Sequence, residues 1–575
     1  MYRPEHPNPQ FEREDWMNLN GPWEFASDHG KSGLDRKLYE DNDEARQAFV
    51  HTIEVPFCPE SSLSGIGCKD FMDAVWYRRT VSLTGDQVKG RTILHFGAVD
   101  YEAHVFVNGA EAGKHMGGYV SFALDVTAQV HEGENTIVVC AVDDVRGGLQ
   151  PAGKQSGSFY SHGCMYTRTT GIWQTVWLEF VPEDYVKEVK YYPDIAAQCF
   201  HISCKVAGAG SITFTALYEG KTVGSVTASV RGDSNQLTLP VSELHLWECG
   251  QGRLYDIVIE YGGDRVTSYA GMRQVRLDGY RFKLNGKTVF QRTVLDQGFY
   301  RDGIYTAPTD EILRRDIELS MDLGFNGARL HEKIFEPRFL YHCDKAGYLV
   351  WGEFPNWGLD LSDPMALMRV LPEWMEEIGR DFNHPAVIGW CPFNETWDYN
   401  GRPQIDGILA NVYQVTKALD PTRPCIDTSG NFHVVTDVYD LHNYDQLPES
   451  FAKCYQGFPE DADSMENHRP RQRYTPGLPL FISEYGGIKW DTSGEHDDAW
   501  GYGSGPKTVE EFIERYRGLT SCLLEHPYIM GFCYTQLYDV EQEVNGLYDY
   551  DRKLKFDAEV IRAITAAPAA IEKED

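Results

Sequence analysis

Residues 387–395 are Val-Ile-Gly-Trp-Cys-Pro-Phe-Asn-Glu, a short apolar run that ends on two polar residues, Asn394 and Glu395. The apolar part, Val387–Trp390, predicts a buried strand. An amphipathic helix is expected just before it, at Met365–Gly379. Strands that alternate with such helices are typical of βαβ units and of a parallel sheet. This stretch therefore predicts an α/β domain whose strands end in polar side chains.

The same alternation begins near Phe282 and continues over about 300 residues, enough for a (β/α)₈ barrel. Further amphipathic helices are expected at Asp310–Leu323 and Val509–Glu525. The strands that we expect are Val289–Leu295, Asn326–Arg329, Tyr348–Glu353, Val387–Trp390, Cys425–Thr428, Val438–Leu441, Leu480–Glu484 and Ile529–Tyr534. Eight strands are the number that a closed barrel needs.

Polar residues gather where these predicted strands end. In a (β/α)₈ barrel the carboxyl ends of the strands form the active site. A buried carboxylate is costly unless it is paired, so several of them at one barrel mouth need a chemical reason. Hydrolysis of a glycosidic bond by two carboxylates supplies that reason. The residues concerned are Asp296, Arg329, His331, Glu353, Asn394, Glu395, His442, Asn443, Glu484, Thr535 and Gln536.

The chain before the barrel predicts two antiparallel β-sandwiches. Strands are expected at Thr92–Phe96, His104–Val107 and Thr136–Val142, and Asn108-Gly109 is a strong signal for a tight turn. A shorter unit with the same alternation follows, and about ninety residues of this kind suggest an immunoglobulin-like sandwich. We therefore expect three domains, at 1–182, 183–276 and 277–575.

Composition limits the classes of partner. The formal charge of −33 would repel nucleic acid and anionic membranes, so neither is expected to bind. The N-terminus has no apolar run of the kind found in signal peptides, and the 13 cysteines include no CxxC pair. These features predict a cytoplasmic protein with reduced thiols.

Several motifs give the chain a resemblance to glycoside hydrolase family 2, the family of β-galactosidases, β-glucuronidases and β-mannosidases. Trp76-Tyr77-Arg78-Arg79, residues 96–100 and residues 171–179 resemble the family's N-terminal jelly-roll module. Residues 324–329 resemble its arginine-bearing second barrel strand, and residues 383–395 and 479–487 resemble its two catalytic segments. The resemblance implies a jelly-roll sandwich, an immunoglobulin-like sandwich and a C-terminal (β/α)₈ TIM barrel.

The resemblance also implies roles for individual residues. Glu395 takes the place of the general acid/base, Glu484 that of the nucleophile, and Asn394 that of the ligand of the sugar 2-hydroxyl. Such a pair implies a retaining exo-β-glycosidase, with its two carboxyl groups about 5–5.5 Å apart. Arg329 could bind at the site or form a structural ion pair with Glu353.

The sugar is less closely defined than the reaction. Asn545 stands where β-glucuronidases of this type carry a lysine for the sugar carboxylate, so a β-galactoside is the default expectation. A β-galacturonide or another β-hexuronide remains an alternative if a different cation supplies the clamp. Arg338 is one such cation, although an ion pair with Glu336 or Asp344 at the start of a helix would also explain it.

Other side chains are expected at the pocket wall. His331 and His442 could bind substrate or only line the wall, and Tyr534 is expected to replace the family's strand-eight tryptophan. Asn443-Tyr444, Trp390 and Trp500 could form sugar platforms or barrel packing.

The expected mechanism requires no cofactor. Some β-galactosidases of the family use magnesium near the acid/base, so magnesium is a possible cofactor, but its full ligand set is not placed in this sequence. The expected partner is a carbohydrate, and the resemblance implies a homo-oligomer. A carbohydrate-binding protein with a decayed barrel is the alternative function, and the presence of both carboxylates argues against it.

Overall fold

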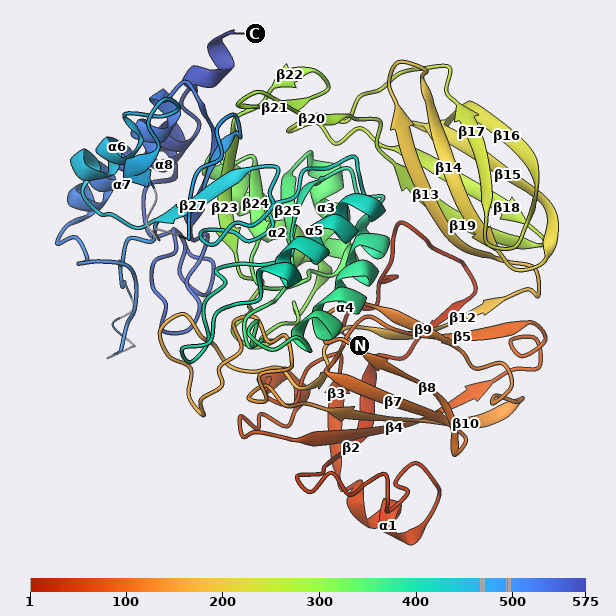
Figure 1. Cartoon of the computed structure of the whole chain (residues 1–575). Coiled ribbons are helices and arrows are strands. Elements are labelled where there is room, and N and C mark those ends of the chain that lie inside the picture. Colours follow the sequence, from red (N-terminus) through yellow and green to blue (C-terminus); the bar gives the residue numbers. More distant parts are fainter. Residues whose placement is uncertain (1, 466–470, 493, 495–497, 575) are drawn as a thin grey trace.

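A computed structural model describes residues 2–465, 471–492, 494 and 498–574 of the 575-residue chain. Figure 1 shows two β-sandwiches, red to orange and yellow, beside a green-to-blue barrel with helices around it. The sequence therefore predicted the fold class correctly. Among the residues described, no helix is long and apolar enough to cross a membrane.

The first sandwich consists of two main antiparallel sheets, ordered β1-β12-β5-β9 and β3-β2-β4-β10-β7-β8. The predicted tight turn joins β7 to β8, with φ of 52° at Asn108 and 77° at Gly109. Positive φ at both residues is what a type I′ hairpin turn needs. The elements are β1 (Trp16–Asn18), β2 (Gly21–Ser27), α1 (Asp43–Ala48), β3 (His51–Val55), β4 (Ala74–Leu83), β5 (Arg91–Phe96), β6 (Val99–Asp100), β7 (Glu102–Val107), β8 (Ala110–Met116), β9 (Phe122–Asp125), β10 (Gly133–Val142), β11 (Gly171–Ile172) and β12 (Val176–Val181).

The second sandwich packs the sheet β13-β14-β17 against the sheet β16-β15-β18-β19. Buried residues alternate with exposed ones along β18, as expected for a strand with one face in the core. Its strands are β13 (Val186–Asp194), β14 (Cys199–Val206), β15 (Ala209–Tyr218), β16 (Lys221–Arg231), β17 (Asn235–Pro240), β18 (Tyr255–Tyr261) and β19 (Asp264–Ala270). A small sheet then leads into the barrel, made of β20 (Val275–Asp278), β21 (Arg281–Leu284) and β22 (Lys287–Thr288).

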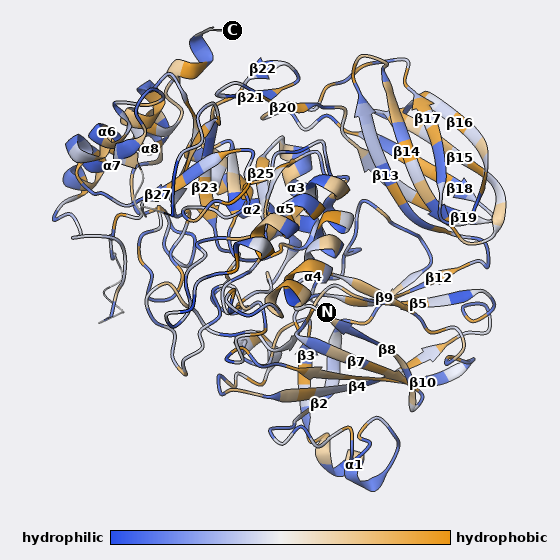
Figure 2. Cartoon of the chain, in the orientation of Figure 1, coloured by the Kyte–Doolittle hydropathy of each residue, from blue (hydrophilic) through white to orange (hydrophobic). Residues whose placement is uncertain are grey.

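The barrel strands form one parallel sheet in the order β26-β25-β24-β23-β29-β28-β27. In β23, β25, β26 and β28 every residue is buried, because helices or the barrel interior cover both faces. In Figure 2 the barrel strands carry hydrophobic and hydrophilic residues together, and in β23 (Gln-Arg-Thr-Val-Leu-Asp) the polar side chains are buried as well. The elements are β23 (Gln291–Asp296), α2 (Asp310–Asp322), β24 (Gly327–Leu330), α3 (Pro337–Ala346), β25 (Leu349–Glu353), α4 (Ala366–Asp381), β26 (Val387–Cys391), α5 (Asp406–Leu419), β27 (Tyr439–Asn443), α6 (Pro448–Tyr455), β28 (Leu480–Gly486), α7 (Val509–Glu525), β29 (Ile529–Thr535) and α8 (Ala558–Thr565).

The prediction of a regular fifth strand at Cys425–Thr428 is wrong. Cys425 in this segment and Ser429 just after it make isolated parallel bridges to Trp390 and Asn394. The buried Asp427 carboxylate accepts hydrogen bonds from the backbone N–H groups of Thr428, Val434 and Val435. Because the Asp427 side chain binds these N–H groups, the segment lies where the fifth strand was expected but does not form a regular ladder of backbone hydrogen bonds.

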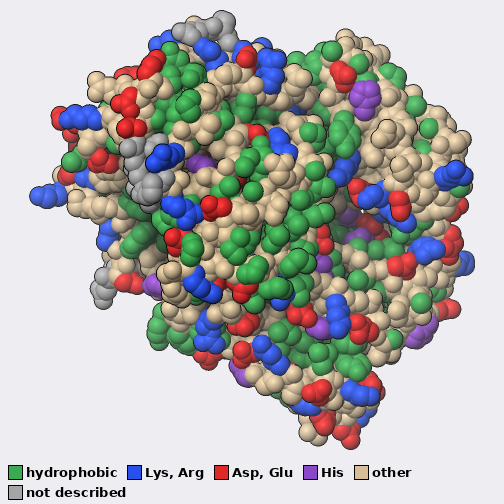
Figure 3. Space-filling view, viewed as in Figure 1, with side chains coloured by type: hydrophobic (Ala, Val, Ile, Leu, Met, Phe, Trp, Pro, Cys, Tyr) green, Lys and Arg blue, Asp and Glu red, His purple; other side chains and the backbone are tan. Residues whose placement is uncertain are grey.

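Both sandwiches are fixed to the barrel by buried hydrogen bonds. The N–H of Tyr119 in the first sandwich donates to Glu373 on α4 at 2.8 Å. Trp247, beside the second sandwich, donates its indole N–H to the carbonyl of Asp344 on α3 at 2.7 Å. Acidic and basic side chains are interspersed over the face shown in Figure 3, rather than gathered in a basic stripe. The sandwiches are therefore placed to contribute to a site on the barrel.

Candidate active site

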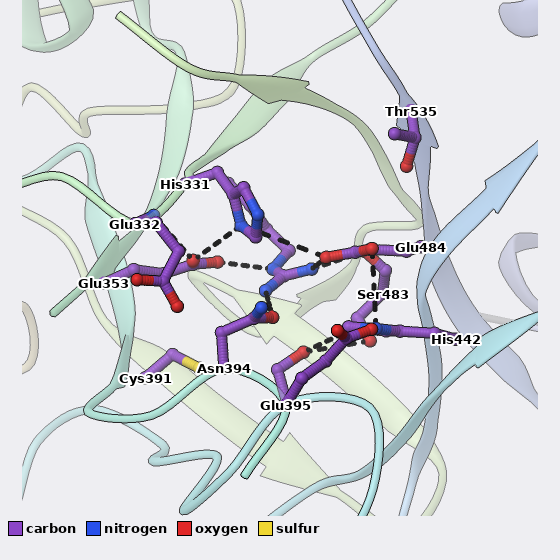
Figure 4. A network of polar contacts seen from close by, with 12 residues as sticks. His331, Glu332, Glu353, Cys391, Asn394, Glu395, His442, Ser483, Glu484 and Thr535 are labelled. Carbon is purple, nitrogen blue, oxygen red and sulfur yellow. Dashed lines mark hydrogen bonds and ion pairs between the residues drawn. The ribbon is translucent and has the colours of Figure 1, made fainter. Parts of the chain in front are cut away.

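Two glutamates and a histidine from three neighbouring parts of the barrel meet at its mouth (Figure 4). Glu395 follows β26, His442 lies near the end of β27, and Glu484 lies in β28. One ligand atom from each of the three side chains lies within 4.8 Å of the other two. The two catalytic carboxylates that the sequence predicts are thus brought together.

Glu484 is buried and held at both carboxylate oxygens. Arg329 donates to Oε1 at 3.1 Å, and the Tyr444 hydroxyl donates to Oε2. His442 Nδ1 lies 3.4 Å from the same Oε2. These contacts fix the orientation of the carboxylate toward the barrel mouth.

Arg329 binds acceptors on three other residues besides Glu484. Its Nε lies 2.5 Å from Glu353 Oε1, and it donates to the Ser483 carbonyl at 2.7 Å and to Asn394 Oδ1 at 3.1 Å. The planar guanidinium suits this arrangement because its donors point in fixed directions. The structural ion pair with Glu353 is therefore present, and the same guanidinium also contacts Glu484 and Asn394.

Glu395 is more accessible than Glu484. Its side chain is 23% exposed, whereas that of Glu484 is 4% exposed. Its backbone has φ +43°, and its N–H donates to the carbonyl of Ser429 at 2.9 Å. His442 Nδ1 lies 2.6 Å from Glu395 Oε1. Glu395 can therefore meet a group that arrives from solvent, while Glu484 lies deeper.

The protonation states follow from burial and neighbouring charge. Burial raises the pKa of Glu353, although Arg329 opposes the shift. Burial and the nearby Lys154 lower the pKa of His331 well below its usual value, so this ring is neutral. Burial alone would lower the pKa of His442, but the carboxylates of Glu484 and Glu395 outweigh it and raise that pKa. Burial alone would raise the pKa of Glu395, but His442 outweighs it and lowers that pKa.

Asn394 is positioned by two residues that the sequence did not single out. Its N–H donates to Asn356 Oδ1 at 2.6 Å, and its carbonyl accepts from Asn356 Nδ2 and from the indole N–H of Trp357, each at 3.1 Å. With the backbone fixed, the Asn394 amide can face a bound sugar. His331 is also in the network, with Nδ1 3.1 Å from Glu353 Oε2.

Tyr534 does not lie at the mouth, which corrects the expected aromatic platform. It is fully buried, with ring centroids 5.6 Å from Tyr485 and 5.0 Å from Tyr516 on α7. Side chains alternate along a strand, so the next residue, Thr535, faces the site, and its hydroxyl lies 3.2 Å from that of Tyr444. The aromatic pair at the site is Tyr444 and Tyr502, stacked with centroids 3.3 Å apart.

Four other expected substrate ligands make contacts within the protein, although Gln536 Nε2 has no hydrogen-bond partner among the described residues. Asp296 accepts from the Tyr538 hydroxyl at 2.5 Å and from Gly298 N–H at 2.9 Å. Asn443 donates to the Tyr455 hydroxyl at 2.9 Å, and Gln536 accepts from Gln297 at 2.9 Å. Arg338 forms a two-point ion pair with Asp310 at 2.6 and 2.9 Å, which favours the structural explanation with a partner that was not expected. Trp390 is core packing, because it is fully buried and donates to Asp420.

Two family models match the chain. The model described as "Glycosyl hydrolases family 2, TIM barrel domain" matches residues 275–563. The chain belongs to glycosyl hydrolase family 2. The model described as "Glycosyl hydrolases family 2, sugar binding domain" matches residues 63–182, which fall within the first sandwich. Membership of family 2 thus covers both the barrel and the domain that packs on it.

Curated relatives of this family 2 chain include enzymes with different named substrates. It is 26% identical over 458 residues to a β-glucuronidase of Rattus norvegicus, covering 71% of this chain and 67% of that one. It is also 26% identical over 379 residues to a β-galactosidase of Thermoanaerobacter pseudethanolicus, covering 62% of this chain. The chain spans about half the length of that second relative, 48%.

Solved structures share the fold over nearly the whole chain. A β-glucuronidase of Lactobacillus rhamnosus superposes with a TM-score of 0.81 at 20% identity, covering 98% of this chain and 99% of that one. A β-glucuronidase of Ruminococcus gnavus, solved with D-glucuronic acid, superposes with a TM-score of 0.79 at 20% identity, covering 98% and 100%. At this identity the likeness shows the shared fold.

Sequence reasoning missed a group of residues from outside the barrel strands. Lys154 and Tyr166 come from the first sandwich, and Glu332, Tyr502 and Glu543 come from barrel loops. Tyr166 donates its hydroxyl to Glu543, and Lys154 lies over Trp357. No local pattern marks these residues, because they reach the site only through the packing of one domain on another. Among the described residues, the group that could hold a metal ion is Glu395, His442 and Glu484, which is the proposed catalytic set itself.

Proposed function

We propose that this family 2 protein is a retaining exo-β-glycosidase that hydrolyses a terminal, non-reducing β-linked sugar. One observation carries the proposal: oxygen atoms of Glu395 and Glu484 lie within 4.8 Å of each other at the barrel mouth. Retaining enzymes hold their carboxyl groups about 5–5.5 Å apart, whereas inverting enzymes need about 6.5–9.5 Å to admit a water molecule. The separation therefore supports double displacement.

Burial and contacts support the division of roles. In the first step the buried Glu484 oxygen attacks the anomeric carbon, the glycosidic C–O bond breaks, and Glu395 passes to the leaving oxygen the proton that it shares with His442. In the second step Glu395 takes a proton from water, whose oxygen attacks the same carbon and releases Glu484. Glu395, exposed by 23%, can reach the leaving group, while Glu484 is fixed by Arg329 and Tyr444. Both reacting groups belong to the chain, so the proposed chemistry requires no cofactor.

His442 links the two steps electrostatically. It lies 2.6 Å from Glu395 and 3.4 Å from Glu484, so it responds to the charge of both carboxylates. When Glu484 becomes a neutral ester, His442 loses one of the charges that raise its pKa. We propose that His442 positions Glu395 and shares with it the proton that the first step consumes.

The test uses activated aryl β-glycosides and their product configuration. Glu484→Gln is expected to reduce turnover by several orders of magnitude while sugar binding persists, because only the nucleophile is removed. Glu395→Ala should slow substrates with poor leaving groups far more than those with good ones. Glu373→Gln is the matched control, since it alters a buried carboxylate that binds the N–H of Tyr119.

Two results would contradict the proposal. An inverted first product, observed by NMR, would exclude double displacement. Sugar binding without turnover on a broad panel of aryl β-glycosides would support the alternative of a carbohydrate-binding protein. The sequence makes a β-galactoside the default substrate and a β-hexuronide its alternative. The names of the relatives include both β-galactosidase and β-glucuronidase.

A further inference from the structure

A loop of the first sandwich is pinned to the barrel beside the catalytic pair. The N–H of Ala152 donates to the carbonyl of Trp357 at 2.7 Å, and the N–H of Gly153 donates to the same oxygen at 3.2 Å. Gly153 has φ +54°, and a Cβ there would lie 2.2 Å from the carbonyl oxygen of Glu332. Only glycine allows so close an approach. The loop thereby places the next residue, Lys154, against the barrel.

A second anchor holds the same loop to the segment that follows β29. The carbonyl of Lys154 accepts from the N–H of Tyr166 at 2.8 Å, and the Tyr166 hydroxyl donates to Glu543. Gln542 donates to the carbonyl of Gly163 at 2.7 Å. Lys154 is therefore fixed between two parts of the barrel rim rather than carried on a free loop.

The Lys154 side chain is largely buried, and among the described residues its ammonium has no hydrogen-bond acceptor. The residue is 6% exposed, and Nζ lies 3.7 Å from the ring centroid of Trp357. Among the described residues it makes no hydrogen bond and no ion pair within 4.0 Å. A buried ammonium is costly unless a paired group offsets its desolvation, and a ring face gives only part of that compensation. An anionic ligand at this position would supply the acceptor that the described residues lack.

Lys154 is nevertheless close enough to the catalytic groups to affect their charge. Burial opposes its positive charge, but Cys164, Glu543 and Glu484 outweigh burial and raise the pKa of Lys154. In turn, Lys154 helps to lower the pKa of Glu395. The ammonium is thus charged and lies beside the place where a terminal sugar must sit to reach Glu484.

We propose that Lys154 binds the carboxylate of the terminal sugar, so that the substrate is a β-linked hexuronide rather than a neutral β-hexoside. This inference rests on the proposed function, because it concerns the sugar that would bind beside Glu395 and Glu484. The sugar carboxylate would give the ammonium its missing partner, and Trp357 would flank the contact. A neutral sugar carries a hydroxymethyl group in place of the carboxylate and would leave the buried charge unpaired.

The first test compares matched substrates on the wild-type protein. Nitrophenyl β-galacturonide and β-glucuronide are measured against nitrophenyl β-galactoside and β-glucoside, and each hexuronide also against its methyl ester. We expect kcat/KM for at least one hexuronide to exceed that of its neutral counterpart and of its ester by about 100-fold or more. The two hexuronides distinguish the orientation of the sugar 4-hydroxyl. The esters remove the charge without any change to the protein, so this result does not depend on the folding of a variant.

The second test uses Lys154→Met. It should reduce kcat/KM for the preferred hexuronide by about 100-fold, a loss at least about tenfold greater than the loss on the neutral hexoside. Lys417→Met is the control, because its ammonium binds the Arg423 carbonyl and Asp437 instead. A preference of the wild type for neutral sugars, or an equal loss on both substrates, would overturn the inference. Absence of all turnover would instead refute the proposed function.

Discussion

Replacing Arg329 with Met tests whether the buried guanidinium organises the catalytic carboxylates. Arg329 is 1% exposed and donates to Glu484 and Asn394, each at 3.1 Å, besides its 2.5 Å contact with Glu353. A hydrogen bond with one charged partner contributes about 1.5–3 kcal/mol, and the Arg329 guanidinium is the charged partner in both bonds. At the lower end of this range, the bonds to Glu484 and Asn394 together give about 3 kcal/mol. We therefore expect kcat/KM to fall by about 10²–10³-fold.

The assay is the initial rate on the best aryl β-glycoside, corrected for the folded fraction of each variant. Arg329→Met leaves two buried carboxylates without their cation, which should also reduce stability by about 3–5 kcal/mol. Arg329→Lys keeps the charge but not the planar set of donors, so we expect it to recover only part of the activity.

Arg423→Met supplies a control with a comparable loss of stability. The Arg423 guanidinium is also buried, but it binds Asp420 at 2.6 Å and the carbonyls of Phe382 and Val387. Its kcat/KM per folded molecule should match that of the wild type. A folded Arg329→Met protein whose kcat/KM stays within about tenfold of the wild type would refute this account of the site.

Two further predictions concern stability and the domain contact. The His433 side chain is buried between Asp427 at 2.8 Å and Asp440 at 3.1 Å. Burial alone would lower the pKa of His433, but the two carboxylates outweigh burial and raise that pKa to about 10. A raised pKa stabilises the fold fully below the unfolded value of about 6.5, and the stabilisation is lost as pH rises through 10. His433→Gln should therefore lower the free energy of unfolding more at pH 6 than at pH 10, as measured by urea denaturation, and an equal loss at both values would contradict the charge assignment. Gly153→Ala should reduce the turnover rate by at least about tenfold, because its Cβ would lie 2.2 Å from the Glu332 carbonyl oxygen and displace the loop. An unchanged turnover rate would show that the loop does not shape the site.

The residues on the barrel strands were predictable because their pattern is local. Each apolar run predicts a strand, and a parallel barrel brings the carboxyl ends of its strands to one face. This argument placed Arg329, Glu353, Asn394 and Glu395 in one site with Glu484. The structure connects Glu353, Asn394 and Glu484 through the Arg329 guanidinium, and it connects Glu395 to Glu484 through His442.

The incorrect sequence predictions concern positions at which side-chain contacts, and not the strand pattern, determine the local structure. Tyr534 faces α7, because the alternation of the strand places Thr535 toward the site. A regular fifth strand does not form, because the Asp427 carboxylate binds backbone donors near it. Asp296 lies at a strand end as predicted, but Tyr538 and Gly298 both bind one of its carboxylate oxygens, Oδ1.

The sequence by itself predicted the barrel and placed Glu395, Glu484 and Arg329 at the ends of its strands, because strand periodicity depends on neighbouring residues. The catalytic roles expected for the two glutamates came from the resemblance to family 2. Only the tertiary structure decided how Glu395 and Glu484 are held and how Lys154 comes beside them. Lys154 lies more than 200 residues from either glutamate in the chain, and its position depends on how the first sandwich packs on the barrel. That packing is a sum of many weak contacts between domains, which no short stretch of sequence encodes.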